Sequence, residues 1–259
     1  MLQHVWERAS QARYLTGIVI ATDDDRIYSA AQSFGACVVM TRSDHVSGTD
    51  RVAEVAAASD AEWVVNVQGD EPTLDPSAID VAILGVLDQE DALMGTLKTR
   101  IFKPEVVQDP NVVKVVTDQQ GDAIYFSRAP IPFIRQTLQE LARTTEPRAA
   151  EQRDSSDSFE GRAGPVRASD TADYFKHIGL YVYRREFLLA YPDLPVGPLE
   201  RAERLEQLRA LENGYKIRVV ETDYDALGVD TPEDLKHVTE LFERTSPGKA
   251  FLNKDMVNK

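Results

Sequence analysis

The segment after the apolar run 63–65 carries two adjacent carboxylates, Asp70 and Glu71, between Gly69 and Pro72. A strand that ends in Gly-Asp-Glu-Pro brings these side chains to the edge of a sheet, where the backbone turns away. Carboxylate oxygens there can bind a hard cation such as Mg²⁺, which in turn binds phosphates. The alternative is an ordinary turn, because Asp, Gly and Pro are common turn residues. The segment alone leaves both interpretations open.

A third carboxylate, Asp230, follows Gly228-Val229 and directly precedes a predicted helix. Open α/β sheets bind ligands at the carboxyl ends of their strands, where Asp70 and Asp230 are both expected. Asp230 taken alone is best interpreted as a turn residue. Paired with Asp70, it would complete a two-carboxylate metal site.

A small-residue turn, Ser47-Gly48-Thr49, leads into a predicted helix and is followed by the fixed positive charge of Arg51. Backbone N–H groups at a helix N-terminus can bind an anion or a polar base edge. Thr49 is expected to be the N-cap of this helix. Ordinary helix capping would explain the same residues.

Polar side chains of three later segments are candidates for ligand binding. Arg128 ends a predicted strand, and its planar guanidinium suits a carboxylate. His177 and Tyr181 are four residues apart on a predicted strand and therefore share a face. Glu206 and Gln207 are expected in the middle of a helix. Each of these residues can also be interpreted as a surface or packed polar residue.

Helices and apolar strands alternate in the first part of the chain. Helical spacing predicts helices over 2–12, 25–34 and 76–87 and another that begins at Thr49. Short apolar runs predict strands over 18–21, 36–41 and 63–68. This alternation predicts an α/β domain with a mixed, mostly parallel sheet flanked by helices.

The pattern changes from residue 93 onward. Strands are predicted over 93–101, 112–117, 123–127 and 177–183, with few helices between them, which indicates a smaller mixed or antiparallel sub-layer at an oligomer contact. Gly197-Pro198 introduces one helix that Gly214 ends. A strand over 216–222 follows, and Thr231 begins a last helix with a capping box.

The composition limits the kind of protein. A net charge of −14 argues against a nucleic-acid-binding protein, which needs a basic face. The single cysteine, Cys37, is typical of a reducing compartment and is interpreted as a packed strand residue. No stretch approaches the about 20 apolar residues of a membrane helix, and the N-terminus does not resemble a signal peptide. We therefore expect a cytoplasmic protein that binds neither nucleic acid nor membrane.

Two segments contain too few apolar residues to form a core. Residues 143–172 are rich in Arg, Glu, Ser, Asp, Gly and Ala, and we expect a disordered insertion there. An inert surface loop is the favoured interpretation, with a regulatory segment as the alternative. Residues 246–259 are expected to form a flexible tail.

The order of these motifs resembles that of the CMP-Kdo synthetase family, the 3-deoxy-manno-octulosonate cytidylyltransferases. The resemblance extends from Met1 to about residue 242, apart from 143–172. The strings NVQGDEP and GVDTPEDL are specific to it, whereas SGTDR or LEQLR alone would not be. The matching segments are 42–51, 66–72, 125–128, 176–181, 198–200, 205–209 and 228–235.

The resemblance implies a single nucleotidyltransferase domain over 1–259, with a Rossmann-like nucleotide-diphospho-sugar transferase fold. It implies a homodimer that makes CMP-Kdo and pyrophosphate from CTP and Kdo, with Mg²⁺, for lipopolysaccharide synthesis. Asp70 and Asp230 would be the catalytic metal ligands. The turn Ser47, Gly48, Thr49 and Arg51 would approach the cytidine. The sugar-acid pocket would be lined by Gln68, Arg128, His177, Tyr181, Glu206 and Gln207.

The chain departs from the family at one place. The family opens with a central strand and a triphosphate-binding loop of the form IPARxxSxRLPGKPL, which these 259 residues do not contain. We therefore expect the neighbours of that strand to lack hydrogen-bond partners, and the chain as written to be poorly stable, with little or no turnover. The alternatives are a related enzyme for a sialic-acid-like substrate and a non-catalytic homologue that binds a sugar acid or a partner subunit.

Overall fold

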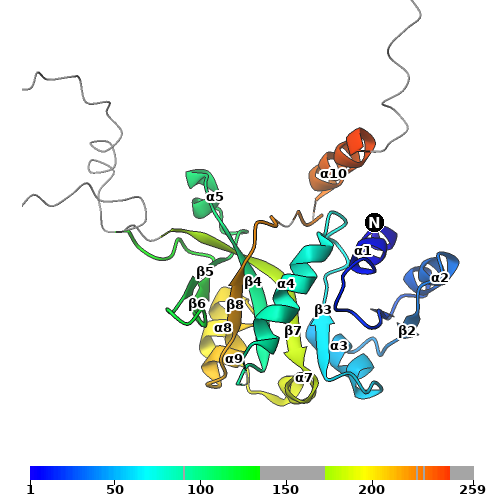
Figure 1. The fold of residues 1–259 in the computed structure, drawn as a ribbon, viewed down its shortest axis with the longest axis horizontal. Helices are drawn as coiled ribbons and strands as arrows, with labels where there is room; N and C mark the ends of the chain where they lie inside the picture. Colours follow the sequence, from blue (N-terminus) through cyan, green and yellow to red (C-terminus); the bar gives the residue numbers. More distant parts are fainter. Residues whose placement is uncertain (90, 135–172, 226, 230, 246–259) are drawn as a thin grey trace, which may run out of the picture.

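The computed structural model describes residues 1–89, 91–134, 173–225, 227–229 and 231–245 (Figure 1). The segments predicted to be disordered, 143–172 and 246–259, lie outside these residues, as does Asp230. The first half of the fold consists of α1 (Leu2–Ala9), β1 (Ile20–Thr22), α2 (Asp25–Ser33), β2 (Val38–Met40), α3 (Gly48–Ala57), β3 (Trp63–Asn66) and α4 (Pro76–Leu87).

The second half begins with β4 (Met94–Arg100), α5 (Pro104–Gln108), β5 (Lys114–Thr117) and β6 (Ala123–Ser127). It continues with β7 (Phe175–Arg184), α7 (Arg185–Ala190), a 3₁₀ turn over Tyr191–Asp193, α8 (Pro198–Glu203), α9 (Leu208–Glu212), β8 (Arg218–Glu221) and α10 (Pro232–Thr245). The short helices α5 and α7 are absent from the sequence-based prediction.

The described strands form two sheets. β1 and β2 pair in parallel as a sheet of their own. The other six strands form a second sheet in the order β6-β5-β7-β4-β8, with β3 also paired to β7. β7 is the longest strand; it pairs with β4 along one edge and with β5 and β3 at opposite ends of the other. Among the described residues β1 pairs only with β2, and β3 only with β7.

The α/β class is confirmed, but the balance of the ladders differs from the prediction. β7 runs antiparallel to β3, β4 and β5, and β5 is antiparallel to β6. Only β1/β2 and β4/β8 are parallel among the described ladders. The strands predicted after residue 93 are also not a separate layer. β4 and β7 pair with each other and lie at the centre of the larger sheet.

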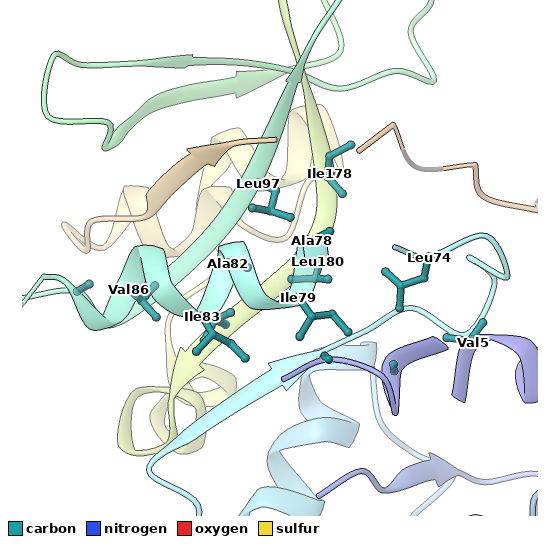
Figure 2. Packing of buried hydrophobic residues seen from close by; sticks show 14 residues of the cluster. Val5, Leu74, Ala78, Ile79, Ala82, Ile83, Val86, Leu97, Ile178 and Leu180 are labelled. Atoms are coloured by element: carbon teal, nitrogen blue, oxygen red, sulfur yellow. The ribbon is translucent and has the colours of Figure 1, made fainter. Parts of the chain in front are cut away.

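A hydrophobic core covers each face of the larger sheet. On one face α4 lies across β4 and β7, as Figure 2 shows, and side chains from α1 join this cluster. Alternate residues of β4 and β7 point to the other face, where α3, α7 and the α8–α9 region pack. Gly95 of β4 permits the close approach of α4, because a Cβ there would overlap the Val86 side chain.

Local signals explain the start of α4 well. Asp75 caps the helix, its carboxylate accepting the Ser77 N–H at 2.9 Å, and Pro76 occupies the first turn.

Cys37, in contrast, does not match its prediction. It is exposed and lies just before β2, since the strand is shorter than the apolar pattern 36–41 suggested. No helix in the described part of the chain is long and apolar enough to span a membrane.

Candidate functional site

The turn before α3 is organised by Ser47, not by Thr49 as predicted. The Ser47 hydroxyl accepts the Asp50 N–H at 3.1 Å, and the Asp50 carboxylate accepts the Ser47 N–H at 3.1 Å. This is a capping box, and it requires the extended backbone that Ser47 adopts. Because Ser47 caps the helix, the Thr49 hydroxyl is not needed for capping and can contact another segment. Gly48 is exposed, with no atom within 4 Å of a Cβ added there.

The carboxylate of Glu206 accepts hydrogen bonds from this turn. Ser47 Oγ donates to Glu206 Oε1 at 3.0 Å, and Thr49 Oγ1 donates to Glu206 Oε2 at 3.1 Å. Burial raises the pKa of Glu206, and the two hydroxyl hydrogen bonds oppose this rise. A residue predicted to bind the sugar acid therefore contacts two residues predicted to bind the nucleotide.

Glu206 and Gln207 lie in a turn between two short helices, not in the middle of one helix. The break follows from Arg204, whose φ of 53° is in the left-handed region and ends α8. Tyr191 fixes the turn, because its hydroxyl donates to the Glu206 carbonyl at 2.8 Å. Gln207 is buried beneath it.

Ion pairing and capping stabilise this α8–α9 corner, which comprises residues 198–212. Arg209 makes two hydrogen bonds to Glu200, from Nη2 at 2.7 Å and from Nε at 2.9 Å, and both side chains are buried. The Glu212 carboxylate accepts the N–H groups of Leu199 and Glu200, each at 2.9 Å. It thereby caps α8, whose own N-cap residue is a glycine.

His177 and Tyr181 share one face of β7, as predicted, with ring centroids 5.4 Å apart. His177 is buried, and burial lowers its pKa to about 3, so the ring is neutral at physiological pH. Its Nε2 lies 3.0 Å from the Thr96 hydroxyl. The single hydroxyl proton of Thr96 bonds to main-chain carbonyls of β7, so Nε2 is the donor in this contact.

Aromatic rings connect His177 to the Glu206 turn. Tyr181 lies 5.9 Å from Tyr183 between ring centroids, and Tyr183 lies 6.0 Å from Tyr191, whose hydroxyl bonds to Glu206. On the other side, Phe126 makes an edge contact with His177 at 5.0 Å. This aromatic row, residues 126, 177, 181, 183 and 191, runs from β6 along β7 to the 3₁₀ turn and is largely buried in the core.

Arg128 directly follows β6. Its Nη1 donates to the Pro110 carbonyl at 3.0 Å and its Nε to the Glu203 carbonyl at 2.9 Å. Its backbone N–H donates to the Glu203 carboxylate at 3.0 Å. A guanidinium has five N–H donors, so two carbonyl contacts orient the group without using all of them. Arg128 is therefore held in place before any ligand binds.

The loop after β3 carries the first predicted metal ligand. Asn66, the last residue of β3, pairs across the sheet with Tyr181, so the loop starts beside the aromatic row. Gln68 is exposed and Asp70 is half-buried. Glu71 is buried, and its carboxylate accepts the Tyr224 hydroxyl at 3.2 Å. Burial raises the pKa of Glu71, and the Asp70 charge adds to this rise.

The second predicted metal ligand, Asp230, lies outside the described residues. The backbone N–H of Val229 donates to the Asp70 carbonyl at 3.0 Å, so the segment before Asp230 reaches the Asp70 loop. Over the described ranges, no three His, Cys, Asp or Glu side chains are grouped to hold a metal ion. Asp70 is therefore the one member of the predicted pair that the structure describes.

Arg51 contacts the ends of two strands. Its Nη2 lies 3.0 Å from the Asp23 carboxylate, and its Nη1 donates to the Thr41 hydroxyl. Since Asp23 follows β1 and Thr41 follows β2, Arg51 ties both strand ends to α3. The sequence-based prediction did not include Asp23 or Thr41.

The structure thus joins some predicted site residues directly and others through residues that the prediction missed. Ser47 and Thr49 contact Glu206, and His177 contacts Tyr181. Glu203 and Lys114 hold Arg128 in place and are absent from the prediction. No local signal could have identified them, because their partners lie 75 and 14 residues away in the sequence.

The chain is similar in sequence to proteins of a known family. Residues 1–217 match the family model described as cytidylyltransferase. A 3-deoxy-manno-octulosonate cytidylyltransferase of Solibacter usitatus is 61% identical over 243 residues, which cover 94% of this chain and 84% of that relative. An enzyme of the same name from Syntrophotalea carbinolica is 51% identical over 92% of this chain and 86% of that relative.

Solved structures show the same relationship. A CMP:2-keto-3-deoxy-manno-octonic acid synthetase, solved in complex with CTP, aligns with a TM-score of 0.77 and 36% identity. The alignment covers 94% of this chain and 87% of that one. A 4-diphosphocytidyl-2C-methyl-D-erythritol synthase from Anaerococcus prevotii, at 12% identity and a TM-score of 0.53, shares the fold.

Proposed function

The chain belongs to the 3-deoxy-manno-octulosonate cytidylyltransferase family, and from this premise we propose that it transfers CMP from CTP to Kdo. In this reaction the anomeric hydroxyl oxygen of Kdo attacks the α-phosphorus of CTP. The new O–P bond forms as the bond to the β-phosphate oxygen breaks. Pyrophosphate leaves, and the hydroxyl proton passes to solvent. The product, CMP-Kdo, would serve lipopolysaccharide synthesis.

The observation that best supports the proposal is that the hydroxyls of Ser47 and Thr49 both donate to Glu206. The turn at 47–49 has the backbone N–H groups of a helix N-terminus, which suit a nucleotide. The Glu206 carboxylate can accept hydrogen bonds from sugar hydroxyls. These segments lie 157 to 159 residues apart in the sequence and meet in the fold, so two substrates bound there would be neighbours.

The remaining predicted residues have complementary roles. Arg128 is positioned to bind the carboxylate of a sugar acid, because its guanidinium is already oriented by two main-chain carbonyls. Neutral His177 and Tyr181 offer an apolar wall with polar edges for the sugar ring. Gln68 and Gln207 supply amide groups near the same strands. Orientation of both substrates accounts for much of the rate in such a transfer.

The residues near Asp70 fit Mg²⁺. This ion is commonly bound by one or two carboxylates and completes its coordination with substrate phosphates and water. We propose Asp70 and Asp230 as its ligands, supported by the bond between Val229 N–H and the Asp70 carbonyl. When bound, Mg²⁺ would neutralise negative charge on the triphosphate and on the departing pyrophosphate.

The proposal is tested by measuring pyrophosphate release from CTP with and without Kdo. In a form of the protein that carries the family's opening strand and triphosphate-binding loop ahead of these residues, release is expected only when both substrates and Mg²⁺ are present. The Asp70→Asn variant should lower kcat by about a hundredfold or more, because a metal-binding carboxylate is lost. Asp60→Asn, the same change at an exposed carboxylate after α3, should leave the rate unchanged. Wild-type rates in Asp70→Asn would show that the metal assignment is wrong.

The same assay separates the alternatives. A faster rate with a sialic acid than with Kdo would indicate the related enzyme. Binding of Kdo by the same form without pyrophosphate release would indicate a non-catalytic homologue.

A homodimer in the cytoplasm is the proposed state of the protein. Support for self-association comes from large apolar side chains that the described chain exposes, among them Phe102, Ile124 and Phe133. Light scattering on a size-exclusion column measures the mass directly. A mass equal to the 28.9 kDa of one chain would contradict the dimer.

A further inference from the structure

Lys114 is a fully buried lysine at the start of β5. Its ammonium group donates three hydrogen bonds, all to main-chain carbonyls: Asp109 at 3.0 Å, Val112 at 2.7 Å and Arg128 at 2.5 Å. An ammonium has three donors, so its hydrogen-bonding capacity is used completely. The lysine therefore acts as an internal cation held by carbonyl oxygens.

These carbonyls belong to the two segments that flank one end of the β5/β6 ladder, where Lys114 pairs with Ser127. Asp109 and Val112 lie in the loop between α5 and β5, and Arg128 follows β6. The same loop contributes the Pro110 carbonyl that accepts Nη1 of Arg128. Lys114 thus fixes both the backbone of Arg128 and the loop that orients its guanidinium.

Glu203 holds Arg128 from the other side. Its carboxylate accepts the Arg128 N–H at 3.0 Å and the Ser127 hydroxyl at 2.6 Å, and its carbonyl accepts Nε of Arg128 at 2.9 Å. Glu203 is the last residue of α8, just before the turn that carries Glu206. Arg128 is consequently clamped between a buried cation on its carbonyl and an anion on its N–H.

Packing alone does not explain a lysine at this position. A buried charge has a high desolvation cost, and a methionine of similar length would fill the space without it. Burial lowers the pKa of Lys114, which is the direction that this cost dictates. The three carbonyls, in contrast, would lose their donors with a methionine. A lysine therefore adds a common donor for the three carbonyls, which fixes the Arg128 carbonyl relative to the 109–112 loop at the end of the β5/β6 ladder.

We propose that Lys114 is a positioning residue for sugar-acid recognition and acts through Arg128, with Glu203 as its counterpart. This inference depends on the proposed function, because it assigns Arg128 to the carboxylate of the sugar acid. Lys114 itself contacts no substrate. Its loss should therefore weaken binding of the sugar acid and leave binding of the nucleotide unchanged.

The first test is calorimetric titration of the full chain with Kdo, and separately with CTP. Lys114→Met should raise the dissociation constant for Kdo by about tenfold, as expected when a charge-assisted contact that orients a binding group is lost. Arg185→Met is the matched control. Arg185 also donates to two main-chain carbonyls, those of Ala56 and Ala57 at the end of α3, and these lie outside the Arg128 clamp.

Chemical rescue separates positioning from a general loss of packing. Lys114→Ala removes three carbons and the ammonium, which propylammonium can replace. Added propylammonium should restore the Kdo affinity of this variant, whereas tetramethylammonium, which has no N–H donor, should not. Glu203→Gln keeps the shape of the side chain and should weaken Kdo binding in the same direction, which keeps the inference testable if the lysine variants unfold.

A readout that needs no ligand comes from the Arg128 Nε–H signal in ¹⁵N NMR spectra, assigned by its absence in Arg128→Lys. Lys114→Met should increase the hydrogen-exchange rate of this group, and Arg185→Met should not. Equal Kdo affinity in wild type and Lys114→Met would overturn the inference while the proposed function stands. Failure of the wild-type chain to bind Kdo would overturn the proposed function and, with it, this role of Lys114.

Discussion

At the scale of single residues, the site is prepared by contacts that its own side chains make. Ser47 and Thr49 satisfy the Glu206 carboxylate, which burial would otherwise make costly to ionise. A ligand that accepts the proton of either hydroxyl must therefore replace a contact with Glu206, whereas a ligand that donates to the hydroxyl need not. This couples the turn before α3 to the α8–α9 corner, and it keeps the polar groups paired when no ligand is present.

His177 supplies a prediction about acid stability. Its pKa is about 3 in the folded chain and near 6.5 when unfolded, so the unfolded chain binds more protons between these values. The contribution of neutral His177 to the free energy of unfolding is fully present above about pH 6.5. It is lost as the pH falls toward 3, by at most about 1.4 kcal/mol per pH unit. Urea unfolding at several pH values between 7 and 4 measures this change in the unfolding free energy.

The His177→Gln variant is the comparison for this prediction. Glutamine does not titrate, so the difference in unfolding free energy between the two proteins should shrink as the pH falls from 7 to 4. A difference that stays constant over this range would show that His177 is not buried in its neutral form. Carboxylates titrate in the same range, but they contribute equally to both proteins and cancel in the difference.

At the scale of elements, the α8–α9 corner depends on side chains for its helix ends. Each helix has six residues or fewer, too few to be stable by itself. Glu212 caps α8, and the Glu200–Arg209 pair crosses from one helix to the other. The left-handed residue Arg204 then presents the Glu206 turn. The break that the prediction missed therefore places Glu206 against the turn before α3.

Removal of the Glu212 carboxylate tests this account of the corner. Glu212→Ala leaves the N–H groups of Leu199 and Glu200 without their acceptor, so the unfolding free energy should fall by about 1 kcal/mol, as for loss of an N-cap. Urea denaturation measures the change. Glu240→Ala, the same substitution on the exposed surface of α10, should alter stability by less than about 0.5 kcal/mol. Equal effects would contradict the capping role.

At the scale of the whole molecule, α1 connects the two sheets. Val5 and Ala9 are buried in the cluster between α4 and the larger sheet. Leu2 and Trp6, on the adjacent side of the helix, pack against the small cluster around β1, α2 and β2. Among the described strands no hydrogen-bonded ladder joins the sheets, so the connection depends on the side chains of α1 and on Arg51 of α3.

Trp6→Ala should therefore weaken the attachment of the β1–β2 sheet. Trp6 packs against Phe34 in a tilted arrangement with ring centroids 5.5 Å apart, and loss of this partly buried ring should cost about 2 kcal/mol. Unfolding should also lose its single transition, because the smaller sheet can then open first. Circular dichroism and tryptophan fluorescence from Trp63 would give different midpoints.

The control for this prediction is Tyr14→Ala. Tyr14 is a large aromatic residue of the same region, but 49% of its surface is exposed. It should change stability little and leave the two probes coincident. Coincident midpoints in Trp6→Ala as well would show that the sheets unfold together without help from α1.

The sequence by itself determined the features that depend on near neighbours. Proline and aspartate at the start of α4 and the capping box at Thr231 are signals within four residues, and the structure contains both. The order of motifs such as Asn66–Pro72 was enough to indicate the cytidylyltransferase family, which the comparisons confirm. The roles of Asp70, Asp230 and Mg²⁺ stay predictions.

Only the tertiary structure decided which of these residues meet. Glu206 contacts Ser47, and Glu203 contacts Arg128, because β7 runs antiparallel between strands from both halves of the chain. Such contacts depend on strand register and helix packing over 75 to 159 residues, and no local propensity encodes them. Lys114 combines both kinds of contact: the Asp109 and Val112 carbonyls lie within five residues of it, whereas the Arg128 carbonyl is brought to it by the β5/β6 ladder.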